Sequence, residues 1–232
     1  MLILCNGMPR SASTWSFNVV TGLLRRWNPA QTVQGGYDED VAGFLRGIDR
    51  DTAHAVLKCH ALDPVGHTLV HIGAAKVVYT WRDIADATVS YMRMFGNDFE
   101  HALQVMSTSL QLYRFHLESG NAVILGYDDI MTFPTEAIEL IARYLGIEAG
   151  PDLIAAVSEE TSLERVREKV EQLNSIEAQG RLIRHENTLY DPETLLNVNH
   201  IRDGGSGYGR ALLSTEQLGR LEDLMRRWGL FE

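Results

Sequence analysis

The sequence has few cysteines and no long apolar run. Its 232 residues include two cysteines, Cys5 and Cys59, and no C-x-x-C or H-E-x-x-H spacing indicates a metal site. Both cysteines lie near the ends of apolar runs, so we expect buried core thiols rather than a functional pair. The first apolar run is too short for a membrane span or a signal peptide. We therefore expect no membrane partner and a cytoplasmic, bacterial-style protein.

Positive charge is also scarce. The chain has 21 lysines and arginines against 31 aspartates and glutamates, a formal net charge of −10. This charge would repel a nucleic acid, so no nucleic-acid partner is expected, and an anionic ligand must be held by local cations and dipoles. The length and the 45% apolar content suit one domain with a substantial core. We expect a single domain over 1–232.

Apolar segments of strand length alternate with helical patterns. Strands are predicted at 2–5, 55–58, 76–80 and 122–125, and helices at 14–27, 84–94, 99–118, 135–145, 163–173 and 215–228. This alternation favours an α/β fold, in which a parallel β-sheet is flanked by helices on both faces. The pattern fades from about 174 to 213, where glycines accumulate. A long irregular segment in a compact domain is more often functional or mobile than inert.

The first strand-to-helix connection is rich in anion-binding groups. It reads Gly7-Met8-Pro9-Arg10-Ser11-Ala12-Ser13-Thr14-Trp15. A short polar loop that opens a helix aims backbone N–H groups at an anion. Arg10 adds a forked cation, and nearby hydroxyls add donors. A phosphate or sulfate is the expected guest, and an ordinary turn with a Ser or Thr cap is the alternative.

The loop departs from that of nucleotide triphosphatases, because Ala12 and Ser13 stand where a Walker A loop has Gly-Lys. It resembles instead the P-K-S-G-T-T-W signature of the cytosolic-type sulfotransferases, which have a P-loop fold and bind PAPS (3′-phosphoadenosine 5′-phosphosulfate). Arg10 replaces the Lys of that signature, Ala12 the Gly and Ser13 a Thr. The resemblance implies a 5′-phosphate site and an adenine-stacking Trp15, formed by Arg10, Ser11, Ala12, Ser13, Thr14 and Trp15.

Two segments further along agree with the same family. Val56-Leu57-Lys58-Cys59-His60 resembles I-K-T-H, whose His is the catalytic base. Residues 78–91 resemble Y-x-x-R-N-P-x-D-x-x-V-S-x-Y, and the resemblance implies that Arg82 and Ser90 hold the 3′-phosphate. The plain alternatives are a solvent-facing Lys and His at a strand end, and a core helix capped by Asp83.

Three later segments are also similar to family motifs. Tyr127 opens a stretch like Y-E-D-[ML], whose Tyr contacts adenine, and Ser162 and Leu163 lie in a stretch like T-S-F, which lines the adenine pocket. The stretch 202–209 resembles R-K-G-x-x-G-D-W, which implies 3′-phosphate contacts from Arg202, Asp203 and Gly204. Asp203 replaces a Lys and so puts an anion beside that phosphate. Taken singly, these stretches also read as a half-buried aromatic residue, a helix cap and a solvated loop.

The resemblance spans residues 7–209 and implies a PAPS-dependent sulfotransferase, which we expect to be a bacterial member. It implies metal-free, in-line transfer of a sulfuryl group from PAPS to the hydroxyl of a small or medium acceptor, such as an alcohol, a phenol or a natural product, with PAP as product. His60 would be the general base, and Arg10 and Lys58 would stabilise developing charge.

The alternatives are a P-loop nucleotide kinase and a non-catalytic nucleotide-binding module. A kinase would need the missing Lys of the loop, and a binding module would not need Lys58 and His60. We expect the acceptor pocket to come from 35–44, 63–67, 92–99 and 174–199, whose aromatic and Met residues favour an apolar acceptor. The sequence leaves the oligomeric state open.

Overall fold

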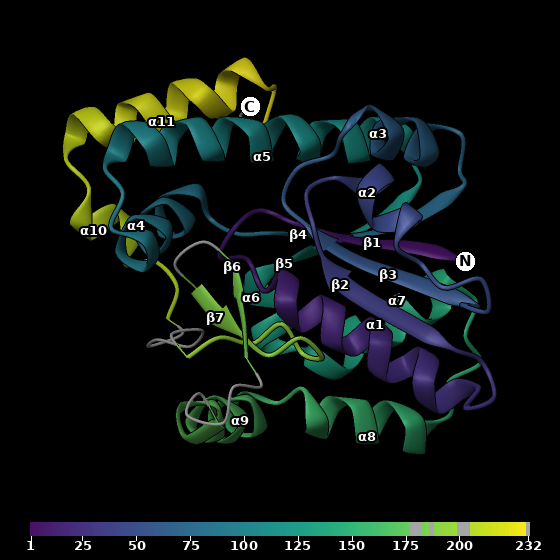
Figure 1. Cartoon of the computed structure of the whole chain (residues 1–232). Coiled ribbons are helices and arrows are strands. Elements are labelled where there is room, and N and C mark those ends of the chain that lie inside the picture. The colour runs from purple at the N-terminus through teal and green to yellow at the C-terminus, as the bar shows by residue number, and fades with distance from the viewer. Residues whose placement is uncertain (177–181, 186–187, 199–204, 231–232) are drawn as a thin grey trace.

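The computed structural model describes residues 1–176, 182–185, 188–198 and 205–230. A five-stranded parallel sheet with strand order β2-β3-β1-β4-β5 forms its centre (Figure 1). Its strands are β1 (Leu2–Asn6), β2 (Val33–Tyr37), β3 (His54–Cys59), β4 (Ala75–Trp81) and β5 (Ala122–Gly126). A separate antiparallel pair consists of β6 (Ile183–His185) and β7 (Thr188–Tyr190).

Helices cover both faces of the sheet, which confirms the predicted α/β class (Figure 1). They are α1 (Ser13–Trp27), α2 (Val41–Arg46), α3 (Pro64–His71), α4 (Ile84–Phe95), α5 (Phe99–Ser119), α6 (Tyr127–Thr132), α7 (Pro134–Leu145), α8 (Pro151–Glu160), α9 (Leu163–Ile176), α10 (Gly209–Leu212) and α11 (Thr215–Arg227). Each predicted strand and helix is present, with bounds within three residues of those predicted.

Successive residues of a strand pack on opposite faces of the sheet. Ile3 of β1 packs in a cluster with α1, α7 and α8, whereas Leu4 packs with residues of α2, α3 and α5. Because side chains alternate along a strand, burial on both faces makes a central strand such as β1 a nearly continuous apolar run. Cys5 and Cys59 are fully buried, as predicted, and burial raises the pKa of the Cys59 thiol to about 12.

The sequence prediction lacks β2 and the helices α2, α3, α6, α8 and α10. Gly35 and Gly36 interrupt β2, which pairs with β3 at the edge of the sheet and has no apolar run. Gly35 has a packing reason, since a Cβ there would lie 2.7 Å from Cζ of Phe17. The interval predicted as irregular, 174–213, contains β6, β7 and α10. Aspartate side chains cap two of the missed helices, α2 and α3. Asp40 accepts the Gly43 N–H, and Asp63 accepts the Gly66 N–H.

The carboxyl ends of β1, β3 and β4 meet at one edge of the sheet, because these strands are parallel neighbours. The loop to α1 follows β1, His60 follows β3, and Arg82 follows β4. Beside this edge, α4, α5 and α11 share a third apolar cluster, and α11 runs along α5 (Figure 1). Ligands of open α/β sheets bind at this edge.

Candidate active site

A cavity of about 1970 Å³ lies at the carboxyl edge of the sheet. Ligand pockets usually measure about 300–1,000 Å³, so this cavity has room for two ligands side by side. The structure brings most of the predicted site residues together here: Arg10, Ala12, Ser13, Thr14, Trp15, Lys58, His60, Arg82, Ser90, Tyr127, Ser162 and Leu163. The predicted residues Arg202, Asp203 and Gly204 lie outside the described residues, and their roles stay predictions.

The start of α1 offers backbone donors to the cavity. Its N-cap, Ala12, has a left-handed conformation (φ 74°) and makes no side-chain cap hydrogen bond. The first N–H groups of a helix lack intrahelical acceptors, so those of Ser13, Thr14 and Trp15 are available to an anion. Arg10 also has a positive φ of 68°. A left-handed backbone costs a non-glycine residue about 1–2 kcal/mol. The sulfotransferase signature has Gly at the position of Ala12, where this conformation occurs.

Ser11 is a correction to the sequence prediction. Its hydroxyl lies 2.6 Å from the Met8 carbonyl oxygen, 2.9 Å from that of Thr80 and 2.8 Å from Thr80 Oγ1. Ser11 is fully buried and its side chain does not line the cavity. The hydroxyl therefore ties the loop to β4 instead of donating to a ligand.

Lys58 and His60 lie against each other at the end of β3. His60 Nδ1 lies 2.6 Å from the Gly7 carbonyl oxygen, so Nδ1 carries the ring proton in the neutral tautomer. Nε2 then accepts a hydrogen bond from Lys58 Nζ at 3.0 Å. The ring thus presents an unprotonated Nε2 that Lys58 engages.

The surroundings favour the neutral imidazole. Burial, reinforced by the charge of Lys58, lowers the pKa of His60 to about 3, although the Gly7 hydrogen bond opposes the shift. Burial also lowers the pKa of Lys58 to about 8, with Glu39 opposing. Lys58 Nζ lies 4.5 Å from the ring centre of Tyr37. The pair therefore combines a neutral imidazole with an ammonium group whose pKa is about 8.

Glu39 anchors the turn that carries His60, a role that the sequence analysis missed. Its Oε2 accepts the backbone N–H groups of His60 at 2.8 Å and Ala61 at 2.6 Å. Its Oε1 accepts the Tyr37 hydroxyl at 2.9 Å. No local signal points to this contact, because Glu39 and His60 are 21 residues apart and meet only through the pairing of β2 with β3.

Arg82 and Ser90 form a second polar region of the cavity. The Arg82 guanidinium lies 4.0 Å from the ring centre of Tyr127, and its Nη2 donates to the Gly205 carbonyl. Arg82 is 7% exposed, and its Nε has no hydrogen-bond partner within the described part of the chain. Ser90 Oγ accepts from Arg10 Nε at 3.1 Å. A buried donor without an acceptor is costly, so these residues fit an anion.

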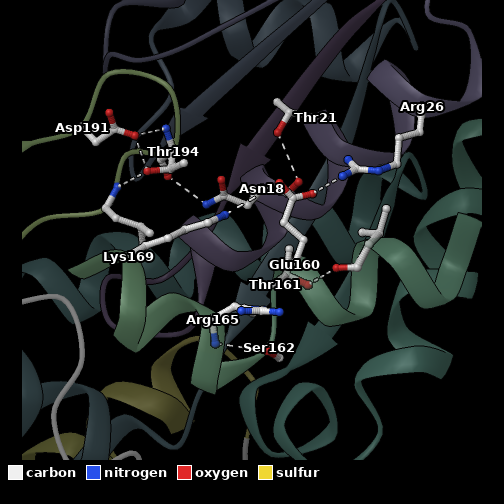
Figure 2. Close-up of polar contacts among 12 residues, drawn as sticks. Asn18, Thr21, Arg26, Glu160, Thr161, Ser162, Arg165, Lys169, Asp191 and Thr194 are labelled. Atoms are coloured by element: carbon white, nitrogen blue, oxygen red, sulfur yellow. Dashed lines mark hydrogen bonds and ion pairs between the residues drawn. The ribbon is translucent and has the colours of Figure 1, made fainter. Parts of the chain in front are cut away.

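One wall of the cavity is the segment 190–198 (Figure 2). Asn18 of α1 donates to the Thr194 carbonyl at 2.8 Å, and the Asp191 carboxylate accepts the Thr194 N–H and hydroxyl at 2.9 and 2.6 Å. Nearby, the Ser162 hydroxyl accepts the Arg165 N–H at 3.3 Å. The Asn18 hydrogen bond joins this wall to α1.

Three of the four segments expected around the acceptor contribute to the cavity, through Tyr37, Met94 and Tyr190 among others. The expectation for 63–67 is wrong. Asp63 caps α3, which leads away from the site, and His67 packs on Phe115 with ring centres 4.6 Å apart. Residues 63–67 therefore lie outside the lining of this cavity.

The Sulfotransferase domain family model matches residues 7–190. The chain belongs to the sulfotransferase family. This confirms the resemblance and makes the chain an enzyme of that class. Among curated proteins, none is significantly similar to this sulfotransferase in sequence.

Solved structures share the fold of this sulfotransferase. Mouse sulfotransferase SULT7A1 complexed with PAP has a TM-score of 0.68 and 15% identity, over 100% of this chain and 85% of that one. Retinol dehydratase with androsterone and the inactive cofactor PAP has a TM-score of 0.68 and 17% identity, over 98% and 80% of the two chains. Its complex with retinol and PAP has a TM-score of 0.66 and 15% identity, over 98% and 80%.

Within residues 1–176, 182–185, 188–198 and 205–230, the sulfotransferase has no group of three or more His, Cys, Asp or Glu side chains that could hold a metal ion. In the same described ranges, every helix is too short or too polar to cross a membrane.

Proposed function

We propose that this sulfotransferase transfers a sulfuryl group from PAPS to the hydroxyl of a small or medium alcohol or phenol and releases PAP. One observation carries the proposal: a single cavity holds the start of α1, the Lys58–His60 pair and the buried Arg82 guanidinium. These two anion-binding regions match the two charged ends of PAPS. PAP in the neighbouring structures supports the donor, and their androsterone and retinol support a small-molecule acceptor.

Different residues of the cavity would bind the 5′-phosphate, the adenine and the 3′-phosphate of the nucleotide. Arg10, Ser13 and Thr14, with the N–H groups of the first turn of α1, would hold the 5′-phosphate. Trp15, Tyr127, Ser162 and Leu163 would line the adenine site. Arg82 and Ser90 would hold the 3′-phosphate, together with the predicted Arg202, Asp203 and Gly204. When bound, PAPS supplies a sulfuryl group on a phosphate leaving group.

His60 Nε2 would take the proton of the acceptor hydroxyl. The hydrogen bond from Nδ1 to the Gly7 carbonyl supports the required tautomer. Burial and the charge of Lys58 lower the pKa of the ring to about 3, which keeps Nε2 unprotonated but makes it a weak base while Lys58 engages it. Lys58 must first release Nε2, which it engages at 3.0 Å. Its ammonium then becomes available to stabilise negative charge on the leaving oxygen, with Arg10 as a second cation.

The nucleotide preference tests the donor. PAP should bind more tightly than AMP, because two charge-assisted bonds to the 3′-phosphate are worth roughly 1.5–3 kcal/mol each. Thermal shift measures this, since a ligand at about 100 times its Kd stabilises a protein by about 2.7 kcal/mol. Equal stabilisation by ATP and PAP, or a response to ATP that needs magnesium, would contradict the proposal and favour a kinase.

Turnover tests the base. The variant His60→Ala should bind PAP like the parent and lose transfer of labelled sulfate by about 10²–10⁴-fold. His101→Ala is the matched control, because His101 lines the same cavity from α5. Activity retained by His60→Ala from pH 6 to 9 would assign the base to another residue. PAP binding without transfer by the parent to any acceptor would favour a non-catalytic module.

A further inference from the structure

Asp86 is a buried carboxylate that the roles above do not use. It lies in the first turn of α4 and is 1% exposed. Its Oδ2 accepts the Gly207 N–H at 2.7 Å, and its Oδ1 accepts the Gly209 N–H at 2.6 Å. These short distances are typical of charge-assisted hydrogen bonds. One carboxylate thus joins α4 to a glycine-rich segment, residues 205–209, that follows 121 to 123 residues later.

The glycine-rich segment also contacts Arg82. The Gly205 carbonyl accepts from Arg82 Nη2, and the Tyr208 ring centre lies 5.5 Å from the guanidinium carbon. Gly209 packs so tightly that a Cβ there would lie 2.3 Å from the Ala85 carbonyl carbon. The segment therefore sits beside Arg82 in a position that α4 determines.

The charge of Asp86 is unfavourable for an anion site. Its Oδ2 lies 3.8 Å from Arg82 Nη2, so it offsets part of the positive charge that a bound anion would use. A neutral side chain would serve electrostatics better. The two backbone hydrogen bonds favour the carboxylate, because the Gly207 and Gly209 N–H groups reach two different oxygens. An amide would place an NH2 donor against one of these N–H groups.

We propose that Asp86 is a positioning residue of the nucleotide site, which holds segment 205–209 against α4 so that this segment completes the anion site around Arg82. The proposal rests on the proposed function, in that the anion is the 3′-phosphate of PAP. Asp86 acts through the segment, and its contribution exceeds the repulsion between its own charge and the phosphate.

The variant Asp86→Asn tests the proposal first without any ligand. Its amide has one acceptor oxygen, so one of the two N–H groups loses its partner. Hydrogen exchange of the Gly207 and Gly209 amides, followed by NMR, should become at least about tenfold faster, while amides of β1 stay unchanged. Asp98→Asn is the control, since Asp98 likewise accepts a backbone N–H, that of His101 at 2.9 Å, at the start of α5. Unchanged exchange at both glycines would overturn the proposal.

Calorimetric titration with PAP and AMP then tests the site. Asp86→Asn should weaken PAP at least about tenfold and change AMP by less than about threefold, because only PAP carries the 3′-phosphate. Tighter PAP binding would show that charge repulsion dominates, and an equal loss for PAP and AMP would show a general folding role. Either result overturns the proposal.

A measurement on the unaltered protein does not depend on how the variant folds. PAP should slow exchange of the Gly207 and Gly209 amides further, and AMP should not; equal effects of the two nucleotides would overturn the proposal. Failure of the proposed function is distinguishable, because the parent would then show no preference for PAP over AMP, whereas ligand-free exchange still reports whether Asp86 holds the segment.

Discussion

The pH dependence of sulfuryl transfer tests the Lys58–His60 pair most directly. The pKa of His60 is lowered to about 3, so the ring stays neutral at every pH from 5 to 9 and the rate should show no acid limb in that range. A histidine with the ordinary pKa of about 6.5 would be only about 3% neutral at pH 5, and the rate would fall about 30-fold. The profile therefore distinguishes a buried, neutral base from an ordinary one.

Deprotonation of Lys58 should lower the rate on the alkaline side of the profile. With its pKa lowered to about 8, the ammonium form falls about tenfold between pH 7 and pH 9, and kcat/KM should fall with it. The quantity to measure is kcat/KM for the acceptor at saturating PAPS, which reports the ionisation of the enzyme–PAPS complex. The value for PAPS itself would also report its 3′-phosphate, which titrates near pH 6. An alcohol acceptor should be used, since a phenol ionises in its own right near pH 10 and would distort the alkaline limb.

The variant Lys58→Arg separates the two residues. A guanidinium keeps its charge throughout this range, so the alkaline limb should disappear even if the rate at pH 7 is lower. Lys169→Arg is the control, because Lys169 lines the same cavity but pairs with Glu160 at 3.7 Å. An acid limb near pH 6.5 in the parent, or an alkaline limb that survives in Lys58→Arg, would refute the reasoning. Nitrogen chemical shifts of His60 provide the same test without an acceptor.

Three further predictions concern stability. His116 is fully buried against Asn6 Oδ1 and its pKa is lowered to about 3, so the folded state favours the neutral ring and stability should fall as pH drops below about 6.5. At pH 4.5 the free energy of unfolding should be lower by about 2–3 kcal/mol for this reason. Urea unfolding should show this pH-dependent loss in the parent and not in His116→Gln. Gly209→Ala should lower the Tm, because its Cβ would meet the Ala85 backbone, whereas Gly219→Ala, with open space around it, should not. Ser11→Ala should destabilise the fold by about 1–3 kcal/mol with PAP affinity nearly unchanged; a tenfold loss of PAP affinity in titration would restore the hydroxyl to the ligand site.

Much of the sheet could be predicted from the sequence, because its central strands are buried on both faces and therefore read as apolar runs. Two helix ends also follow from local residue types. Asp83 accepts the Asp86 N–H at the start of α4, and Gly146 ends α7 with a left-handed φ of 77°. The site residues after β1, β3 and β4 could be placed together as well, since parallel strands end at a common edge.

The contacts that organise the site were decided by the tertiary structure. Glu39 reaches His60 across 21 residues, and Asp86 reaches Gly207 across 121, through hydrogen bonds that no local spacing announces. The Ser11 hydroxyl points into the protein because Thr80 of β4 provides acceptors there. A sequence specifies what neighbours within a few residues determine, such as caps and apolar periodicity. The direction of a side chain and the partner of a buried charge depend on which distant segments the folded sheet brings beside them.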